Sequence, residues 1–369
     1  MFFKCQTHSH QHDQFTSHSP ANEGGRALEK TRSGQTTVDI HCHVHVLEAD
    51  EMLKTLAPED TGRLMVDTNE VTARINKTQQ ETILPKLTEP EVRIKDMDAQ
   101  GIDIQAVSPS PFHYNYHYDP EFTRETSKVV NNRIAEVVAD HPERFVGMGT
   151  VPLQNCELAI AEMERCVNKL GFRGIEISTN VKGNDLTRAG LESFFAKAEE
   201  LGTLIFMHPI GTSFKERMND HYFRNTIGHP LESALAVGHL VFDGYLDKFP
   251  KLNICIAHGG GYIPAYYGRF DHPFHLRDDC RENITKAPSE FLGQLYFDTV
   301  VFTETQLRHM IEVWGADHIV MGTDYPYDMA EPDPVGHVNS VKNLSDSDRD
   351  LITGGNALRL LGLNESALN

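Results

Sequence analysis

Eight short runs of β-branched and other apolar residues recur along the chain with helix-like stretches between them. Of all the features of the sequence, this alternation constrains the possible folds most strongly. Stretches 156–171 and 191–202 carry apolar residues at helical spacing and end in glycine, a usual helix stop. Strands that alternate with helices form a parallel sheet, and eight such units close a (β/α)8 TIM-like barrel. We therefore predict this α/β fold with strands at Val38–His43, Asp103–Ser108, Phe145–Thr150, Gly174–Ser178, Leu204–His208, Asn253–His258, Gln294–Asp298 and Ile319–Thr323.

Two segments do not fit the regular alternation. Residues 46–90 are much longer than an ordinary connection after the first strand, and we predict an insertion over the C-terminal mouth of the barrel. Residues 1–36 are polar and rich in histidine, and they lack the apolar stretch of a secretory signal, which predicts a disordered tail. No internal linker divides residues 37–369, so we expect one barrel domain.

Composition excludes several classes of protein. The net charge of −19 argues against a nucleic-acid partner, which needs a basic face. No apolar run approaches the roughly 18 to 20 residues of a membrane span. The six cysteines show no C-x-x-C spacing and several fall in apolar stretches, which indicates reduced thiols, no disulfides and a cytoplasmic location.

Polar side chains stand at the C-terminal ends of four predicted strands, and the same mouth of the barrel collects all of those ends. His41 and His43 alternate on the first strand, so both leave the same face and converge. The fifth, sixth and eighth strands end near His208, His258 and Asp324, respectively. The sequence therefore predicts one polar cluster at the mouth.

Three imidazoles and a carboxylate suit one divalent ion and leave a position open for water. We assign His41, His43, His208 and Asp324 as ligands, with zinc as the first candidate metal and manganese as the second. His258 precedes three glycines and is interpreted as the acid/base beside a metal-bound water, with Asp324 as its catalytic neighbour. A structural hydrogen bond is the alternative role for His258.

The segments "DIHCH", "EVRIKDMDAQGIDIQAVS", "MHP", "FPKLNICIAHGGGYIPAYYGRF", "MGTDYPY" and "GGNALRLLGL" occur in this order. Together they resemble the decarboxylase branch of the amidohydrolase superfamily, typified by 2-amino-3-carboxymuconate-6-semialdehyde decarboxylase, over residues 38 to about 365. The resemblance implies a distorted barrel, a single zinc ion and non-oxidative decarboxylation. It also implies the same four ligands and the same acid/base role for His258.

The resemblance extends to a substrate-binding arginine. Arg269 in "YYGRF" matches an arginine that binds the substrate carboxylate in a neighbouring subunit, which implies a homodimer. A structural ion pair with Asp271 or Asp298 is the alternative for Arg269.

The insertion departs from the family pattern. Glu81 stands where the resembled enzymes have a second carboxylate-binding arginine. If the loop were displaced relative to that of the resembled enzymes, Arg74, Lys77 or Lys86 would take the role of the second arginine. The substrate of the resembled enzymes is therefore not transferred to this chain.

Three functions remain open at this point. The first is metal-dependent decarboxylation of a carboxylated unsaturated or aromatic acid, which makes a small carboxylic acid the expected partner. The second is a metal-dependent hydrolase or hydratase acting on products of aromatic ring cleavage, because the same water, base and metal would serve. The third is a barrel that binds a ligand without catalysis.

Several other side chains carry weaker signals. His45 is interpreted as a loop residue outside the metal set, and His229 as the start of a helix. Glu176 is either a substrate contact or a structural partner of an arginine. Phe112, Tyr114 and Tyr116 either stack on an aromatic substrate or pack in the core.

Overall fold

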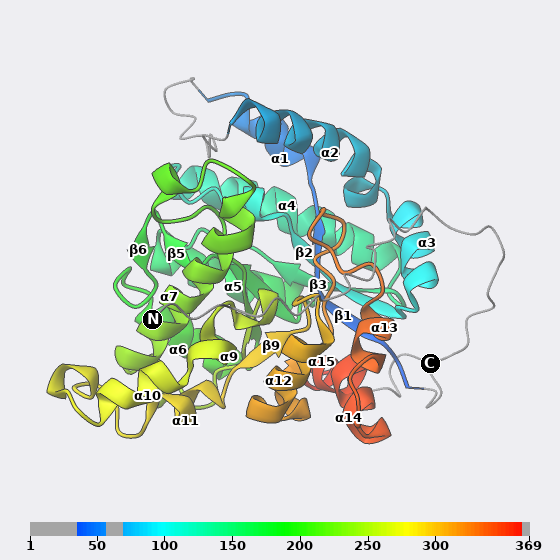
Figure 1. Cartoon of the computed structure of the whole chain (residues 1–369). Coiled ribbons are helices and arrows are strands. Elements are labelled where there is room, and N and C mark those ends of the chain that lie inside the picture. Colours follow the sequence, from blue (N-terminus) through cyan, green and yellow to red (C-terminus); the bar gives the residue numbers. More distant parts are fainter. Residues whose placement is uncertain (1–34, 57–68, 364–369) are drawn as a thin grey trace.

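The computed structural model describes residues 35–56 and 69–363, whose centre is a barrel of eight parallel strands surrounded by helices (Figure 1). The eight predicted runs each overlap one barrel strand, so the predicted α/β barrel is confirmed. A separate hairpin of β5 (Asn180–Val181) and β6 (Asn184–Asp185) was not predicted. Around the barrel the strands are β1 (Val38–Val44), β2 (Ile104–Pro109), β3 (Phe145–Gly149), β4 (Gly174–Ile177), β7 (Leu204–Met207), β8 (Ile254–Ile256), β9 (Tyr296–Asp298) and β10 (Ile319–Val320).

The barrel closes between β1 and the residues that follow β10. Tyr325 forms a parallel bridge with Cys42, and the backbone N–H of His43 donates to the Tyr325 carbonyl at 2.8 Å. The backbone N–H of Asp324 donates to the His41 carbonyl at 2.8 Å. Closure therefore joins the first barrel strand directly to the segment that carries Asp324.

The helices pack their apolar faces on the outside of the barrel. In α5 the side chain of Asn155 caps the first turn, and buried Ala159, Met163 and Cys166 recur at helical spacing. His229 begins α7, as predicted. The helices are α1 (Leu47–Leu53), α2 (Glu70–Thr88), α3 (Pro90–Gln100), α4 (Pro120–Asp140), α5 (Cys156–Lys169), α6 (Glu192–Leu201), α7 (His229–Phe242), α8 (Tyr245–Lys248), α9 (Ile263–Tyr266), α10 (Gly268–Phe274), α11 (Pro288–Leu292), α12 (Glu304–Trp314), α13 (Pro334–Asn339), α14 (Asp346–Asp350) and α15 (Asn356–Leu360).

A bulge in β1 determines which of its side chains face the inside of the barrel. The pairing of β1 with β2 shifts by one residue between Asp39 and Cys42. Ile40 belongs to the apolar cluster that fills the barrel, whereas Cys42 packs in the layer between the barrel and the helices. A bulge redirects the side chains that follow it. His41 and His43 consequently point inward above Ile40, and Cys42 points outward.

The first two helices belong to the predicted insertion 46–90, of which residues 57–68 lie outside the described residues. The side chain of Asn69 caps α2 by accepting from the Thr72 N–H. The backbone N–H and the side-chain amide of Asn69 both donate to the Asn219 carbonyl, each at 3.2 Å. This contact attaches α2 to the segment after β7. The predicted tail lies outside the described residues except for positions 35 and 36.

Two further observations concern the described part of the chain alone. None of its helices combines the length and the apolar character needed to cross a membrane. Cys5 lies outside this part. The remaining cysteines are free thiols: Cys42, Cys156, Cys166, Cys255 and Cys280.

A buried histidine fixes the chain as it leaves β1. The Nε2 atom of His113 accepts the backbone N–H of Val46 at 2.9 Å, and its ring stacks on His45 at 4.4 Å between centroids. His45 in turn pairs with Asp50 at 2.7 Å. Burial and the neighbouring His45 lower the pKa of His113 to about 3. His113 is therefore neutral and acts as an acceptor.

This depressed pKa makes folding stability depend on pH. Above pH 6.5 the stabilisation is fully present, and it is lost as the pH falls toward 3, because only the unfolded chain then protonates His113. We expect His113→Gln, which keeps an acceptor, to reduce the loss of unfolding free energy between pH 7.5 and 5.5 by about 1.4 kcal/mol. Chemical denaturation of both proteins at the two pH values measures this difference. Equal losses in both would contradict the assignment.

Candidate metal centre

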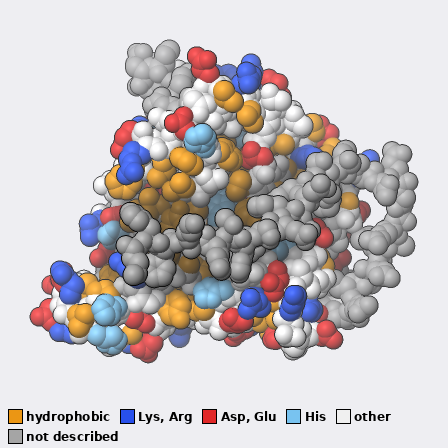
Figure 2. Space-filling view, viewed as in Figure 1, with side chains coloured by type: hydrophobic (Ala, Val, Ile, Leu, Met, Phe, Trp, Pro, Cys, Tyr) orange, Lys and Arg blue, Asp and Glu red, His pale blue; other side chains and the backbone are white. Residues whose placement is uncertain are grey.

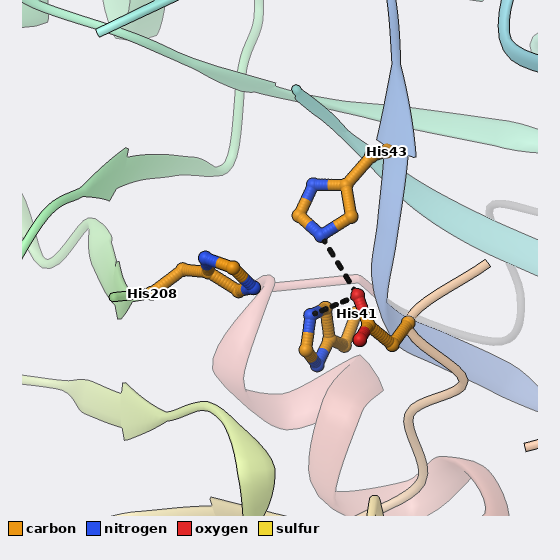
Figure 3. Close-up of side chains that lie close together, drawn as sticks. His41, His43 and His208 are labelled. Atoms are coloured by element: carbon orange, nitrogen blue, oxygen red, sulfur yellow. Dashed lines mark ion pairs between the residues drawn. The ribbon is translucent and has the colours of Figure 1, made fainter. Parts of the chain in front are cut away.

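Four buried side chains meet at the C-terminal mouth of the barrel, and they are the four that the sequence predicts as metal ligands. One donor atom from each of His41, His43, His208 and Asp324 lies within 4.8 Å of the others. Two residues come from β1, one follows β7 and one follows β10 (Figure 3). The barrel thus brings together residues from both ends of the chain.

The geometry of the cluster fits a bound cation. The Nε2 atoms of His41 and His43 each lie 3.3 Å from Oδ1 of Asp324. Neither Nε2 atom makes a hydrogen bond within the described part of the chain, and the same holds for both ring nitrogens of His208. Buried polar atoms nearly always have a hydrogen-bond partner or a bound ion. We therefore expect these nitrogens to bind a group that the protein itself does not supply. Three imidazoles and one carboxylate are donors that can hold a divalent metal ion.

The charges around the cluster also favour a cation. Burial disfavours a charge on His41, but Asp324 and Asp298 outweigh burial and raise its pKa to about 10. Burial likewise disfavours ionised Asp324, yet His41 and the other imidazoles hold its pKa well below the usual range. Burial and the nearby His258 keep the pKa of His208 well below its usual value. The carboxylates therefore stabilise positive charge, while the His208 ring stays neutral and able to coordinate.

The two histidines of β1 are oriented by bonds on the far side of their rings. Nδ1 of His41 lies 2.6 Å from Oδ2 of Asp298, and Nδ1 of His43 lies 3.2 Å from the Pro109 carbonyl. A histidine that donates from one ring nitrogen presents the other as a free acceptor. Both rings therefore direct Nε2 toward the centre of the cluster.

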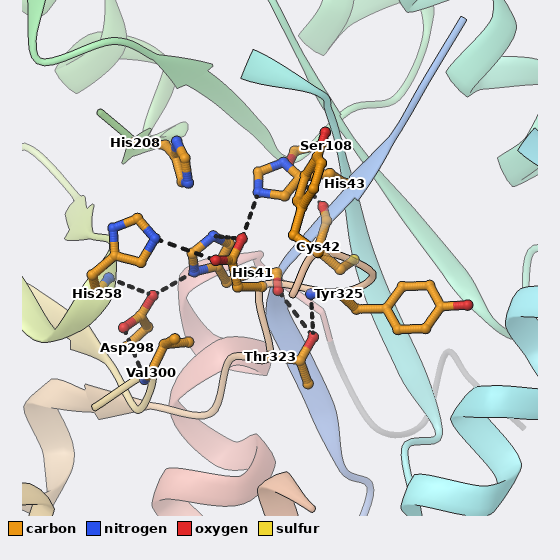
Figure 4. A network of polar contacts seen from close by, with 12 residues as sticks. His41, Cys42, His43, Ser108, His208, His258, Asp298, Val300, Thr323 and Tyr325 are labelled. Atoms are coloured by element: carbon orange, nitrogen blue, oxygen red, sulfur yellow. Dashed lines mark hydrogen bonds and ion pairs between the residues drawn. The ribbon is translucent and has the colours of Figure 1, made fainter. Parts of the chain in front are cut away.

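Asp298, the last residue of β9, connects the cluster to the turn that carries His258 (Figure 4). Oδ2 accepts the backbone N–H of His258 at 2.9 Å as well as the ring of His41. Oδ1 accepts the backbone N–H groups of Gly259 at 2.7 Å and Val300 at 3.1 Å. One buried carboxylate therefore fixes a candidate ligand and the neighbouring turn together.

His258 lies beside the cluster without belonging to the four-residue set. Its Nε2 is 3.5 Å from Oδ2 of Asp324, and its ring centroid is 4.8 Å from that of His208. The turn requires glycine, because a Cβ at Gly259 would lie 2.4 Å from Val301. The close turn directs the imidazole at the mouth, where it can exchange a proton with a ligand.

A cavity of about 480 Å³ opens above the cluster, and His208, His258 and Asp324 form part of its wall. This volume is in the range of small-molecule sites. Figure 2 shows hydrophobic side chains gathered over the middle of this face. The other walls are largely aromatic or apolar with several amides, including Phe112, Tyr222, Tyr262, Phe302, Tyr327, Asn76 and Gln79.

The predicted substrate contacts have different outcomes. Arg269 is exposed on α10 and is not among the described residues that line the cavity. Its suggested structural partners bind elsewhere, since Asp271 accepts from Ser289 and Asp298 from His41. Arg269 therefore does not reach the cavity of its own chain.

The insertion presents amides, not cations, to the cavity. Glu81, Arg74 and Lys77 are exposed on α2 and do not line the cavity. Lys86 pairs with Asp96 at 2.7 Å. None of the three cations considered as replacements for the family arginine thus lies in the cavity wall of the described residues.

Glu176 is buried beside the cluster, where it has structural partners. Its Oε1 accepts the Tyr114 hydroxyl at 2.5 Å, and its Oε2 lies 3.7 Å from Nδ1 of His43. Tyr114 and Tyr116 are buried and stack on each other at 5.4 Å between centroids. Packing is therefore the role of these two tyrosines, whereas Phe112 lines the cavity.

Sequence reasoning missed the roles of Asp298, Arg224 and His229 at this site. Asp298 ends a predicted strand, which was the available signal, but it was considered only as a partner of Arg269. His229 and Arg224 both line the cavity, and the His229 ring lies 6.1 Å from that of His258. No sequence motif marks these two residues.

Comparison with known sequences decides the family. The sequence model named Amidohydrolase matches residues 38–363. The chain belongs to the amidohydrolase family. The predicted resemblance is thereby confirmed.

Two relatives indicate the range of chemistry in the family. Over 276 residues the chain is 35% identical to a 2-amino-3-carboxymuconate-6-semialdehyde decarboxylase from Dictyostelium discoideum, covering 74% of this chain and 77% of the relative. Over 303 residues it is 26% identical to a 2-keto-4-carboxy-3-hexenedioate hydratase from a Sphingobium species, covering 75% of this chain and 85% of the relative.

A solved structure shares the fold. It is a 5-carboxyvanillate decarboxylase from Novosphingobium aromaticivorans, complexed with manganese and 4-hydroxy-3-methoxy-5-nitrobenzoic acid. The TM-score is 0.79 at 24% identity, and the match covers 90% of this chain and 97% of that chain.

The bond between Asp298 and His41 leads to a prediction about metal affinity. We expect Asp298→Asn to weaken zinc binding by about 10- to 100-fold, because losing such a carboxylate leaves the ligand ring poorly oriented. Competition with a fluorescent chelator measures the dissociation constant. Asp271→Asn on α10 is the matched control, since its carboxylate binds Ser289 far from the cluster. Binding by Asp298→Asn within twofold of wild type would contradict this role.

Proposed function

We propose that this amidohydrolase is a metal-dependent, non-oxidative decarboxylase of a carboxylated aromatic or unsaturated acid. The observation that carries the proposal is the set of three imidazoles and one carboxylate at the floor of a largely apolar cavity. The 35% identity to a decarboxylase from Dictyostelium discoideum supports the choice of reaction.

His41, His43, His208 and Asp324 would hold one divalent ion. The ion would supply a positive charge that binds and polarises the oxygen atoms of the substrate. Zinc is the proposed metal because imidazole-rich sites with one carboxylate suit it, and manganese is the alternative because a structural neighbour contains it.

The residues of this chain would position the acid and manage one proton. Loss of CO2 breaks a carbon–carbon bond and leaves an electron pair on the ring or alkene carbon, which must then take up a proton. His258 borders the cavity beside Asp324 and is placed to deliver that proton. Nε2 of His258 lies 3.5 Å from Oδ2 of Asp324, and this contact would help to hold the ring in the orientation needed for transfer. The apolar walls exclude water and strengthen these electrostatic interactions.

Free buried thiols favour a reducing compartment for this chemistry. Cys42, Cys166 and Cys255 are buried, and burial raises the pKa of all three, which keeps them protonated and unreactive. Cytoplasm is the proposed location.

The decisive experiment measures CO2 release from carboxylated muconate, salicylate and resorcylate acids by the zinc-loaded protein. We expect His258→Gln to lower kcat by about 10²- to 10⁴-fold, because the proton donor is lost. Its metal content should match wild type, since His258 is outside the ligand set. His141→Gln, remote from the cavity, should keep full activity. Unchanged kcat in His258→Gln would rule out the acid/base role.

Hydration or hydrolysis is the alternative reaction. The 26% identity to a hydratase is the observation that supports this alternative. The two reactions differ in their products. Decarboxylation releases CO2 and takes a proton from solvent, whereas hydration or hydrolysis incorporates solvent oxygen into the product. Reactions in ¹⁸O-labelled water distinguish them by mass spectrometry. Label in a new hydroxyl or carboxyl group, without CO2 release, would favour the alternative.

We further propose that the active unit is a homodimer in which Arg269 reaches the cavity of the neighbouring subunit. The exposure of Arg269 supports this, as does the exposed apolar surface of Tyr266 and Leu276 on the same part of the molecule.

Subunit mixing tests the dimer. Arg269→Ala and His258→Gln should each be nearly inactive alone, because each lacks one part of every site. After random exchange of equal amounts, half of the dimers are mixed and each has one complete site, so activity should recover to roughly a quarter of wild type. Absence of recovery, with exchange verified by native mass spectrometry, would contradict a shared site.

A further inference from the structure

His229 lies in the cavity wall and has no part in the proposed proton transfer. It is the first residue of α7 and directly follows the π-helical turn Arg224–Gly228. Its ring centroid lies 6.3 Å from that of His208 and 6.1 Å from that of His258. A third imidazole therefore borders the cavity, beside a candidate metal ligand and the proposed proton donor.

The residues before and after His229 are in close contact with their surroundings. Pro230 follows it, and a Cβ at Gly261, in the turn after β8, would lie 2.3 Å from the Pro230 carbonyl oxygen. Gly228 precedes it, and a Cβ at Gly228 would lie 2.8 Å from the Thr212 side chain. This close packing fixes the backbone of His229 before a substrate binds.

The ring of His229 is available to bind a polar group of the substrate. No hydrogen bond joins the ring to another residue of 35–56 or 69–363. Burial and the neighbouring His258 lower the pKa of His229 to about 3, so the ring is uncharged near neutral pH. An uncharged imidazole has one N–H donor and one acceptor nitrogen. The ring therefore offers both kinds of hydrogen bond to a ligand.

We propose that His229 binds an uncharged hydroxyl or amino substituent of the substrate, close to the carbon that His258 protonates. This inference rests on the proposed decarboxylase function and names a group that its substrate carries. A hydrogen bond spans about 3 Å between heavy atoms, so imidazoles whose centroids are 6.1 Å apart can both contact one small molecule. A carboxylate would suit this position less well, because an uncharged imidazole supplies one donor and no positive charge.

The apolar parts of the wall make this contact selective. Placed against Phe112, Val301 or Phe302, a hydroxyl or amino group would lose its hydrogen bonds with water and gain none from these side chains. At His229 the same group keeps a hydrogen bond. Binding there consequently favours the orientation of the substrate in which the reacting carbon lies beside His258.

Binding of simple benzoates tests the inference without measuring turnover. The probes are the 2- and 3-isomers of hydroxybenzoate and aminobenzoate, each compared with the methylbenzoate of the same substitution. They are titrated calorimetrically at pH 7.5 into the zinc-loaded full chain, and a CO2 assay verifies that none reacts during the titration. The ratio of the methylbenzoate Kd to the Kd of its hydroxy or amino counterpart measures the polar preference.

We expect His229→Phe to lower the polar preference about fivefold for at least one isomer, because one hydrogen bond is lost. Comparing the ratio between proteins cancels the contributions of the metal and of apolar contact to each Kd. The Kd for unsubstituted benzoate should change less than about threefold.

Three further variants control for chemistry and folding. His229→Gln keeps a donor and an acceptor and should keep part of the polar preference. His141→Phe makes the same change outside the cavity wall and should keep all of it. His229→Leu also lacks hydrogen-bonding atoms and replaces His229→Phe if thermal unfolding shows that the latter does not fold.

The outcomes separate the role of His229 from the reaction. The inference is overturned if His229→Phe keeps the wild-type polar preference for every isomer, or if His141→Phe lowers it equally. If CO2 is released from a substrate while His229→Phe binds all probes like wild type, the decarboxylase proposal stands and the role of His229 fails. If the polar preference depends on His229 but no acid releases CO2, the binding role stands and the proposed reaction fails.

Discussion

The carboxylate of Asp298 is the interaction on which the geometry of the site depends. It is fully buried and accepts bonds from the His41 ring and from the backbone at His258, Gly259 and Val300. Burial works against its charge, but these donors lower its pKa and keep it ionised. A buried carboxylate with so many donors has one stable arrangement, so the candidate metal ligand His41 and the turn that carries His258 are fixed relative to each other. The tight glycine turn after His258 is tolerable because this carboxylate anchors it.

The sequence predicted the barrel and the metal cluster for the same physical reason. Strands of a parallel barrel all end at one mouth, so polar residues at strand ends converge whatever their separation in the chain. His41, His43, His208 and Asp324 each occupy such a position, and counting strands was enough to bring them together. The bulge in β1 was not predictable, because an alternating pattern looks the same on either side of one inserted residue.

Residues outside the strands could not be placed from the sequence. Arg224 reaches the cavity through a π-turn, and no residue spacing distinguishes that turn from an ordinary loop or helix start. The insertion contains three cations that were considered as replacements for the family arginine, but Arg74 and Lys77 are exposed on α2, as is Glu81, and Lys86 pairs with Asp96. Which face of a helix covers a cavity depends on tertiary packing. Arg269 is exposed and lies outside the cavity wall of its own chain, so the proposed contact with a second subunit cannot be located from one subunit.

The closure of the barrel has a consequence for how the protein is made. Asp39 and Thr323 are hydrogen-bonded across a sequence separation of 284 residues, and the candidate ligands His41 and Asp324 stand directly beside them. A ribosome must release nearly the whole barrel before these two segments can meet, so the metal site can form only as one of the last steps of folding. An ion bound there would tie the first strand to the segment after the last one. Metal binding would then stabilise the closed barrel against separation of these two segments, in addition to any role in catalysis.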